Sequence, residues 1–299
     1  MKKIILFSII LFSNYSFSVE SFCPKGTNPD SNVLFCESFE RAGSSESSID
    51  FQPYFVATDD NGSLTRTTEE SIQGSHSAKA NWSQGAINAG SFQINFGRHP
   101  FSSQINSKED IREIYWRMYV KYPSNFVNYP SKYSRLMIMA DNNWAQAMIA
   151  HVWGHSGNEA LLKSDPATGV VNNVLKTTKW NDFANLKWLG AKFAKTSMTK
   201  GQWICLEAHV KLNDAGMSNG IFELFINDQQ ETTDNGLNWV GNWNQYGLNS
   251  ILFSNYWNGG SSVAQSRFID AIVISKNKIG CLNSNQKQPK EPTNIIVNH

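Results

Sequence analysis

The sequence lacks several features that would assign it to a common function class. Its 299 residues carry a formal net charge of only +1, so no excess of charge favours nucleic acid or an anionic membrane as a partner. Three enzyme motifs are missing: the Gly-x-Ser-x-Gly elbow, the His-Glu-x-x-His zinc helix and the glycine-rich phosphate loop. No expected strand carries the closely spaced carboxylates of retaining jelly-roll glycosidases, which disfavours hydrolysis by a carboxylate pair.

Long apolar runs are also missing after the N-terminus. There, Lys2 and Lys3 precede a short apolar run over residues 4–12, and small residues follow at Ser16 and Ser18. This order is typical of a secretory signal peptide, and the run is shorter than the roughly 20 residues that span a bilayer. We therefore expect a secreted or periplasmic protein with no membrane attachment after processing.

The remaining chain is long enough for one large domain. We predict a signal peptide over 1–18, a single domain over 19–282 and a disordered tail over 283–299, where Gln, Lys, Pro and Asn cannot build a core. We expect a monomer.

Cysteine is scarce, and its even number points to disulfides in an exported chain. Four cysteines allow three connectivities. We favour Cys23–Cys36, which closes a short N-terminal loop, and Cys205–Cys281, which ties a central strand to the C-terminal end. No close Cys-x-x-Cys pair supports a metal site instead.

Short alternating segments, separated by Gly, Asn, Ser and Pro, dominate what is present, and no long amphipathic helix is visible. This pattern predicts an all-β fold, an antiparallel two-sheet β-sandwich or jelly roll. Residues 154–200 are expected to form a loop with a short strand that covers a groove and carries Trp180 and Trp188. The expected strands lie at residues 34–40, 51–55, 63–68, 77–82, 91–96, 111–122, 135–140, 144–153, 250–257 and 267–275, together with a hairpin over 202–228.

The hairpin over residues 202–228 is the stretch around which we expect the sandwich to be organised. In its first strand Ile204 to Leu212 alternate, with one wholly apolar side. The other side carries Cys205, Glu207, His209 and Lys211. Residues 111–122 show a second such face, with Tyr115, Arg117 and Tyr119 opposite an apolar stripe. These two faces indicate one sheet whose outer side binds a polar, anionic ligand, although a solvated face with ordinary ion pairs is the alternative.

The residue types on these strands suit β-elimination of a uronic-acid polysaccharide. This reaction needs a cation or amide to neutralise the sugar carboxylate, a base to take the adjacent proton, and an acid to protonate the leaving oxygen. Candidates of these types are Arg117, Gln146, His151, His209, Lys211 and Tyr256. Gln146 and His151 are five positions apart, so a bulge would be needed to place both in one groove. A structural role is the alternative for a lone histidine in an apolar strand.

Three stretches resemble the concanavalin A-like jelly-roll polysaccharide lyases, the group that includes alginate and glucuronan lyases. They are residues 113–117, residues 146–151, and Tyr256-Trp257-Asn258-Gly259-Gly260 with Gln265 beyond. The sequence departs from the family pattern, because four residues rather than one separate Gln146 from His151 and the last stretch lacks Lys-Ala-Gly. The resemblance implies that Arg117 and Gln146 bind the carboxylate, that His151 is the base and that Tyr256 is acid or base. His209 is a rival base.

A structural calcium ion is a further possibility, and no other cofactor is expected. An early Glu40 and a late Asp270 resemble the oxygen ligands of calcium in carbohydrate-binding sandwiches. A hydrogen-bonded buried Asp is the alternative.

Two functions from different classes remain open. The first is an exported polysaccharide lyase that acts on an anionic polysaccharide. The second is a noncatalytic glycan-binding or adhesion sandwich that uses its ten tryptophans and its tyrosines to contact sugar.

Overall fold

Strands and loops make up the part of the chain that the structure, a computed structural model, describes, namely residues 32–102, 108–155 and 158–282. No helix occurs in these residues, so none is available to cross a bilayer. The predicted signal peptide (1–18) and tail (283–299) lie outside the described residues. The strands are β1 (Val33–Glu37), β2 (Val56–Thr58), β3 (Leu64–Thr67), β4 (Ser77–Trp82), β5 (Asn88–Asn95), β6 (Glu113–Lys121), β7 (Lys132–Met139), β8 (Gln146–His155), β9 (Asn158–Thr168), β10 (Val170–Val171), β11 (Val174–Leu175), β12 (Lys187–Trp188), β13 (Lys192–Ser197), β14 (Trp203–Lys211), β15 (Gly220–Ile226), β16 (Gln229–Leu237), β17 (Ser250–Tyr256) and β18 (Gln265–Ser275).

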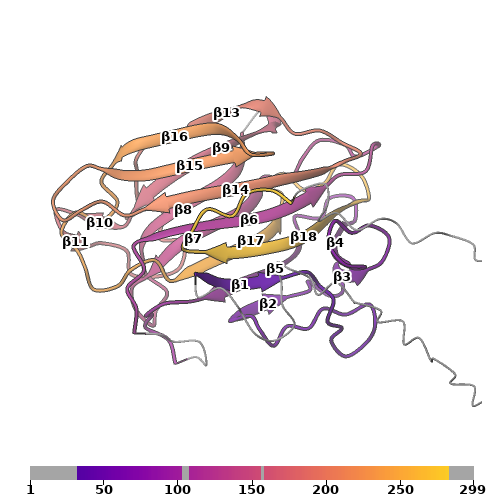
Figure 1. Ribbon diagram of the computed structural model, residues 1–299, viewed down its shortest axis with the longest axis horizontal. Helices are drawn as coiled ribbons and strands as arrows, with labels where there is room; N and C mark the ends of the chain where they lie inside the picture. The colour runs from indigo at the N-terminus through magenta and orange to yellow at the C-terminus, as the bar shows by residue number, and fades with distance from the viewer. Residues whose placement is uncertain (1–31, 103–107, 156–157, 283–299) are drawn as a thin grey trace, which may run out of the picture.

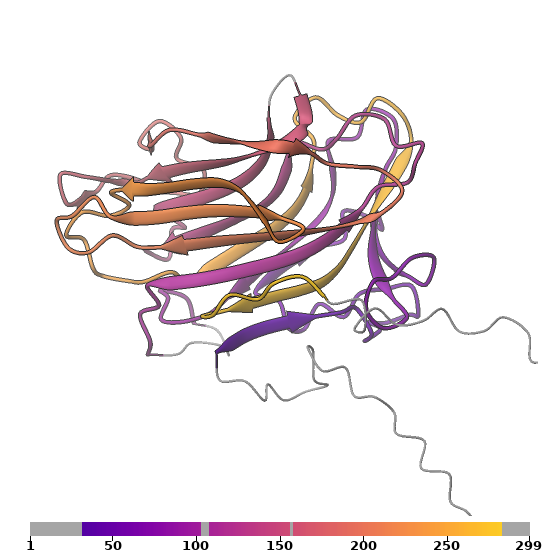
Figure 2. The same cartoon turned by 45° about the horizontal axis from the view of Figure 1, so that its top comes forward.

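Two antiparallel sheets of eight strands each form a sandwich (Figures 1 and 2). The first sheet has the order β16-β15-β14-β6-β18-β4-β3, with β1 paired to β18. The second has the order β12-β9-β8-β7-β17-β5-β2, with β13 paired to β9. The predicted all-β jelly roll is therefore confirmed, and the predicted hairpin is present as β14 and β15.

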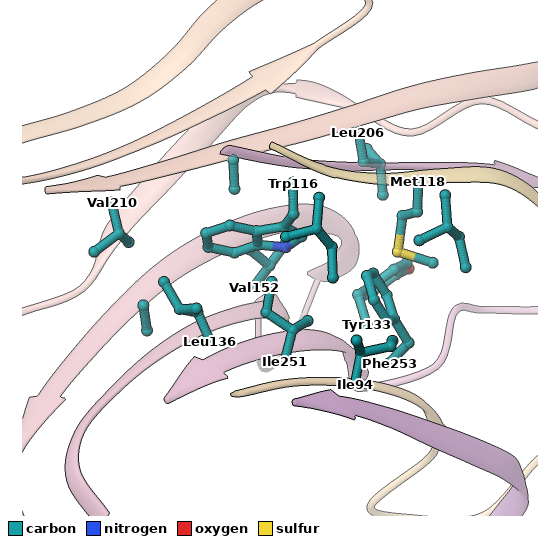
Figure 3. Packing of buried hydrophobic residues seen from close by; sticks show 14 of the residues in the cluster. Ile94, Trp116, Met118, Tyr133, Leu136, Val152, Leu206, Val210, Ile251 and Phe253 are labelled. Atoms are coloured by element: carbon teal, nitrogen blue, oxygen red, sulfur yellow. The ribbon is translucent and has the colours of Figure 1, made fainter. Parts of the chain in front are cut away.

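The core lies between the two sheets, as Figure 3 shows. Trp116 of β6 and Leu206 of β14 come from the first sheet, and they face Leu136 of β7 and Ile251 of β17 from the second. The apolar side of β14 is buried as its alternation predicts, because a strand with one apolar side must place that side against another layer.

Some strand predictions were wrong. Residues 158–168, expected in a loop, form the long strand β9, and the polar strand β16 was missed. The segment of β9 lacks clean alternation and contains Pro166, which obscures the strand signal. Residues 51–55 form no strand.

Candidate functional site

The outer face of the first sheet is covered by the C-terminal segment of the chain and is not an open groove. Residues 276–282 cross β14 and β6 (Figure 1). Glu207 accepts hydrogen bonds from the backbone N–H groups of Ile279 (2.8 Å) and Gly280 (2.9 Å), and Arg117 donates to the carbonyl of Gly280 (2.9 Å). The acid and the guanidinium are thus occupied by the protein's own backbone.

A disulfide and a tyrosine fix the same segment. Cys205 and Cys281 are bonded as predicted, and the hydroxyl of Tyr119 accepts a hydrogen bond from the N–H of Leu282. Cys23 lies outside the described residues, so the Cys23–Cys36 pairing stays a prediction. The polar face of β14 therefore anchors the C-terminal segment.

His209 lies further along this face in a closed set of contacts. Its Nδ1 is 2.7 Å from Glu223 and its Nε2 is 3.0 Å from Glu113, while its ring stacks on Tyr115 at 4.0 Å. Lys211, which is exposed, lies 3.9 Å from Glu113. The expectation of a groove on this face is corrected accordingly, because its polar groups pair with one another and with the backbone.

A large cavity among the described residues lies instead on the outer face of the second sheet. Its volume is about 720 Å³. Strands β2, β5, β7, β8 and β17 supply most of its wall, and the loops after β7, β11 and β17 supply the rest. The lining residues are Val56, Asn88, Ser91, Gln93, Lys132, Ser134, Arg135, Trp144, Trp153, Trp180, Asn181, Phe183, Leu252, Ser254, Tyr256 and Asn258.

Two bulges determine which side chains of β7 and β8 face this cavity. Lys132 pairs with Trp153 and Ser134 pairs with Val152, so Tyr133 is an extra residue in β7. Lys132 and Arg135, which would point to opposite faces of a regular strand, therefore both line the cavity.

The second bulge, at Ala147, has the same effect on β8. Met139 pairs with Gln146 and Ile138 pairs with Met148, which leaves Ala147 as the extra residue. Gln146 and His151 therefore lie on the same side of the sheet. A bulge between them is what the sequence analysis expected to be necessary for a shared groove. Both are fully buried beneath the cavity wall.

Lys132 has unusual electrostatics for a lysine. Burial, with the charges of Arg135 and Lys163 next in importance, lowers the pKa of its ammonium group to about 7. Its Nζ lies 2.9 Å from the ring centroid of Trp153. Near neutral pH about half of the Lys132 side chains are therefore free amines that can accept a proton.

Arg135 supplies a buried positive charge in the same wall. Burial lowers its pKa to about 9, so it stays cationic at neutral pH. Its Nη1 donates to Asn181 Oδ1 (2.7 Å) and its guanidinium lies 4.0 Å from the Trp180 ring. Its buried Nε has no hydrogen-bond partner among the described residues. Arg135 also lines the cavity, so a carboxylate bound there would lie near its guanidinium group.

His151 pairs with Arg135 in the ladder between β8 and β7. Its Nδ1 lies 2.9 Å from the carbonyl oxygen of Asp165, which can only accept, so Nδ1 carries the proton and Nε2 a lone pair. Burial, followed by the charge of Arg135, lowers the pKa of His151 well below its usual range. The ring is 0 % exposed and is covered by Trp153 and Trp188, so the structure places it beneath the cavity.

The remaining predicted residues are distributed between the two sheets. Tyr256, at the end of β17, is 39 % exposed and lines the cavity. Gln146 Oε1 accepts from the N–H of Asn181 (3.2 Å) and so holds the loop that carries Trp180. Gln265 bonds both backbone groups of Val127 and lines a smaller hollow of about 260 Å³.

Glu40 and Asp270 do not fit a calcium site. Glu40 accepts from the N–H groups of Ser75 and His76, and Asp270 accepts from those of Ile72 and Gln73. Calcium requires several oxygen ligands, whereas the partners of these carboxylates are backbone N–H groups, the His76 ring and a single hydroxyl, that of Ser75. The described residues contain no cluster of three or more His, Cys, Asp or Glu that could hold a metal ion. The two carboxylates instead anchor one loop to the first sheet.

Sequence analysis alone missed Lys132, Arg135 and Asn181. The first two occur as Lys-Tyr-Ser-Arg at the start of a strand, and alternation without a bulge separates them. Asn181 lies in the segment that was expected to cover a groove, and Trp180, predicted there, does line the cavity.

Comparisons with known proteins agree with this fold. Residues 172–267 match the family model of polysaccharide lyase 14, whereas no curated protein matches the sequence. A PL-14 alginate lyase from Aplysia kurodai superposes with a TM-score of 0.56 at 13 % identity, over 81 % of this chain and 98 % of that one. An endo-β-1,4-glucuronan lyase from the fungus Trichoderma reesei gives 0.53 at 9 % identity, over 81 % and 94 %.

The alginate lyase vAL-1 from Chlorella virus gives a TM-score of 0.50 at 12 % identity, over 75 % of this chain and all of that one. The matched segment 172–267 includes Trp180, Asn181, Phe183 and Tyr256 of the cavity. The protein has the jelly-roll sandwich fold of these lyases, and over residues 172–267 its sequence is similar to polysaccharide lyase 14.

Proposed function

We propose that the protein is a polysaccharide lyase that cleaves a uronic-acid polysaccharide by β-elimination in the cavity of the second sheet. The observation that carries this proposal is the pair Lys132 and Arg135 in one wall. An amine with a pKa of about 7 lies beside a buried guanidinium, and both residues line the cavity. The family match over residues 172–267, and neighbours named as alginate and glucuronan lyases, support the same reaction.

The reaction begins with recognition of the sugar carboxylate. Arg135 donates to it from a site largely shielded from water, where a charge-assisted hydrogen bond is stronger than in solution. Withdrawal of electron density by the neutralised carboxylate makes the C–H on the adjacent carbon more acidic.

The free amine of Lys132 then removes this proton. The electron pair of the C–H bond forms a carbon–carbon double bond as the bond to the glycosidic oxygen breaks. The phenol of Tyr256 protonates the leaving oxygen, so that one chain ends in an unsaturated uronate and the other in a free hydroxyl. The proton on Lys132 and the phenolate of Tyr256 return to their starting states through solvent.

The test is ultraviolet absorbance of the unsaturated product when the purified protein is mixed with alginate, glucuronan or another polyuronate. Wild-type protein should produce this absorbance with at least one polymer, and Lys132→Met should not. Retention on a glycan without any new absorbance would instead favour the noncatalytic binding module, which the exposed aromatic residues near the cavity also suit.

We also infer export. The N-terminal pattern of Lys2, Lys3 and a short apolar run supports it, and the Cys205–Cys281 disulfide is typical of oxidising compartments. N-terminal sequencing of the mature protein should begin at Val19.

A further inference from the structure

A transverse row of side chains leads from the cavity to the edge of the second sheet. Lys132 of β7 pairs with Trp153 of β8, Trp153 pairs with Lys163 of β9, and Lys163 pairs with Phe193 of β13. Residues directly opposite in a ladder project from the same face of a sheet. With strands about 4.8 Å apart, this row extends roughly 14 Å from Lys132 to Phe193.

Contacts between these side chains agree with the register. Lys132 Nζ lies 2.9 Å and Lys163 Nζ 5.6 Å from the ring centroid of Trp153, so two lysine amino groups flank one indole. At the far end, the Phe193 ring packs against His155 at 4.6 Å and is still 50 % exposed.

Two further aromatic rings connect this row to the cavity. Trp188, which is 42 % exposed, lies 6.1 Å from Trp153 and stacks on Phe183 at 6.3 Å with 12° between the ring planes. Phe183 itself is 46 % exposed and lines the cavity. Single exposed hydrophobic residues are ordinary, but a connected group of exposed rings next to a cavity marks a binding surface.

We propose that Lys132, Trp153, Lys163 and Phe193, with Trp188 beside them, form a track for the sugar residues of a long polyuronate that extend beyond the cavity. The inference rests on the proposed function and deepens it, because it makes the substrate a long polymer instead of a short oligosaccharide. The C–H faces of sugar rings pack on Trp188 and Phe193, and the ammonium groups attract the carboxylates.

The charges along the track are consistent with an anionic polymer. Arg135 and Lys163 carry positive charge, and about half of the Lys132 side chains are protonated near neutral pH. Asp165 is bound to Lys163 at 2.6 Å. Near neutral pH the row therefore retains a net positive charge, and the exposed rings at its end add contact area without adding charge.

The experiment measures binding separately from turnover. Phe193→Ala and Trp188→Ala are made in a Lys132→Arg background, which keeps the positive charge but has no free amine. Met217→Ala is the matched control, since Met217 is 56 % exposed on a loop outside the cavity. Dissociation constants are measured by calorimetry for a polyuronate of long chain length and for a trisaccharide of the same sugar.

Each ring removed should weaken binding of the long chain by about fivefold, as expected for one aromatic stacking contact, while the trisaccharide and Met217→Ala are unaffected. Equal weakening for both ligands, no weakening, or no binding of the polymer would overturn the track. If the polymer binds with the expected length dependence but wild-type protein releases no unsaturated product, the proposed lyase function fails and the track stands. If wild-type protein cleaves the polymer but both variants bind it normally, the track fails and the function stands.

Discussion

The pH dependence of turnover follows from the electrostatics of Lys132. With a pKa of about 7, this side chain is about nine-tenths free amine at pH 8 and about one-tenth at pH 6. Only the free amine removes a proton, so kcat/KM should rise about tenfold from pH 6 to pH 8. The substrate carboxylate stays ionised over this range and does not add to the slope.

The assay is the initial rate of absorbance increase at substrate concentrations far below KM, in buffers of constant ionic strength. Lys132→Met should lower kcat/KM about a hundred- to ten-thousand-fold, the usual range for loss of a general base. Lys132→Arg should do the same, because a guanidinium does not deprotonate. Lys276→Met, which removes a half-buried lysine paired with Glu109 on the other side of the molecule, is the control and should leave the profile unchanged. A profile that is flat between pH 6 and pH 8, or an active Lys132→Arg protein, would refute the assignment.

Three further predictions concern other parts of the structure. Arg135→Gln should lower kcat/KM by about a hundredfold or more while the protein stays folded by circular dichroism, because the sugar carboxylate loses its charged donor; unchanged kinetics would exclude Arg135 as the carboxylate ligand. His151→Ala should reduce the melting temperature more than it reduces turnover, since the ring lies beneath the cavity wall, and a loss of turnover as large as that of Lys132→Met would make it the base instead. Replacing Cys205 and Cys281 by Ser should lower the free energy of unfolding by about 4.5 kcal/mol, from the chain-entropy relation for a separation of 76 residues, with kcat unchanged; equal denaturant midpoints would contradict this.

The fold could be predicted from the sequence largely because burial imposes alternation. The apolar side of β14 is stable only when it is buried against the other sheet, so its orientation could be predicted. Strand β4 was predicted with its observed bounds. The even cysteine count and the expected export predicted disulfides but left three connectivities open, and the favoured Cys205–Cys281 pair is present. Strand β9 was missed because its one-dimensional pattern is weak, and its place is set by pairing with β8 and β13.

The candidate site was less predictable, because polar faces look alike in sequence whatever they contact. Glu207 and Arg117 have the residue types of a sugar site, but they bind a backbone segment more than 70 residues away along the chain. That long-range contact leaves no local signal in the sequence. Lys132 and Arg135 were missed because regular alternation places them on opposite faces of a strand. Their common orientation depends on one extra residue, Tyr133, which the sequence pattern does not reveal.

The bulges at Tyr133 and Ala147 have a consequence for comparing this chain with other sandwiches of its kind. Against a sandwich whose strand lacks the bulge, an alignment that runs without a gap through β7 or β8 is offset by one position on one side of it. It would then match a cavity residue here with a core residue there, although the two backbones superpose. Equivalent catalytic groups in such proteins should therefore be matched by the face from which they project, and a one-residue insertion or deletion in either strand is enough to exchange the polar and apolar sides of the wall.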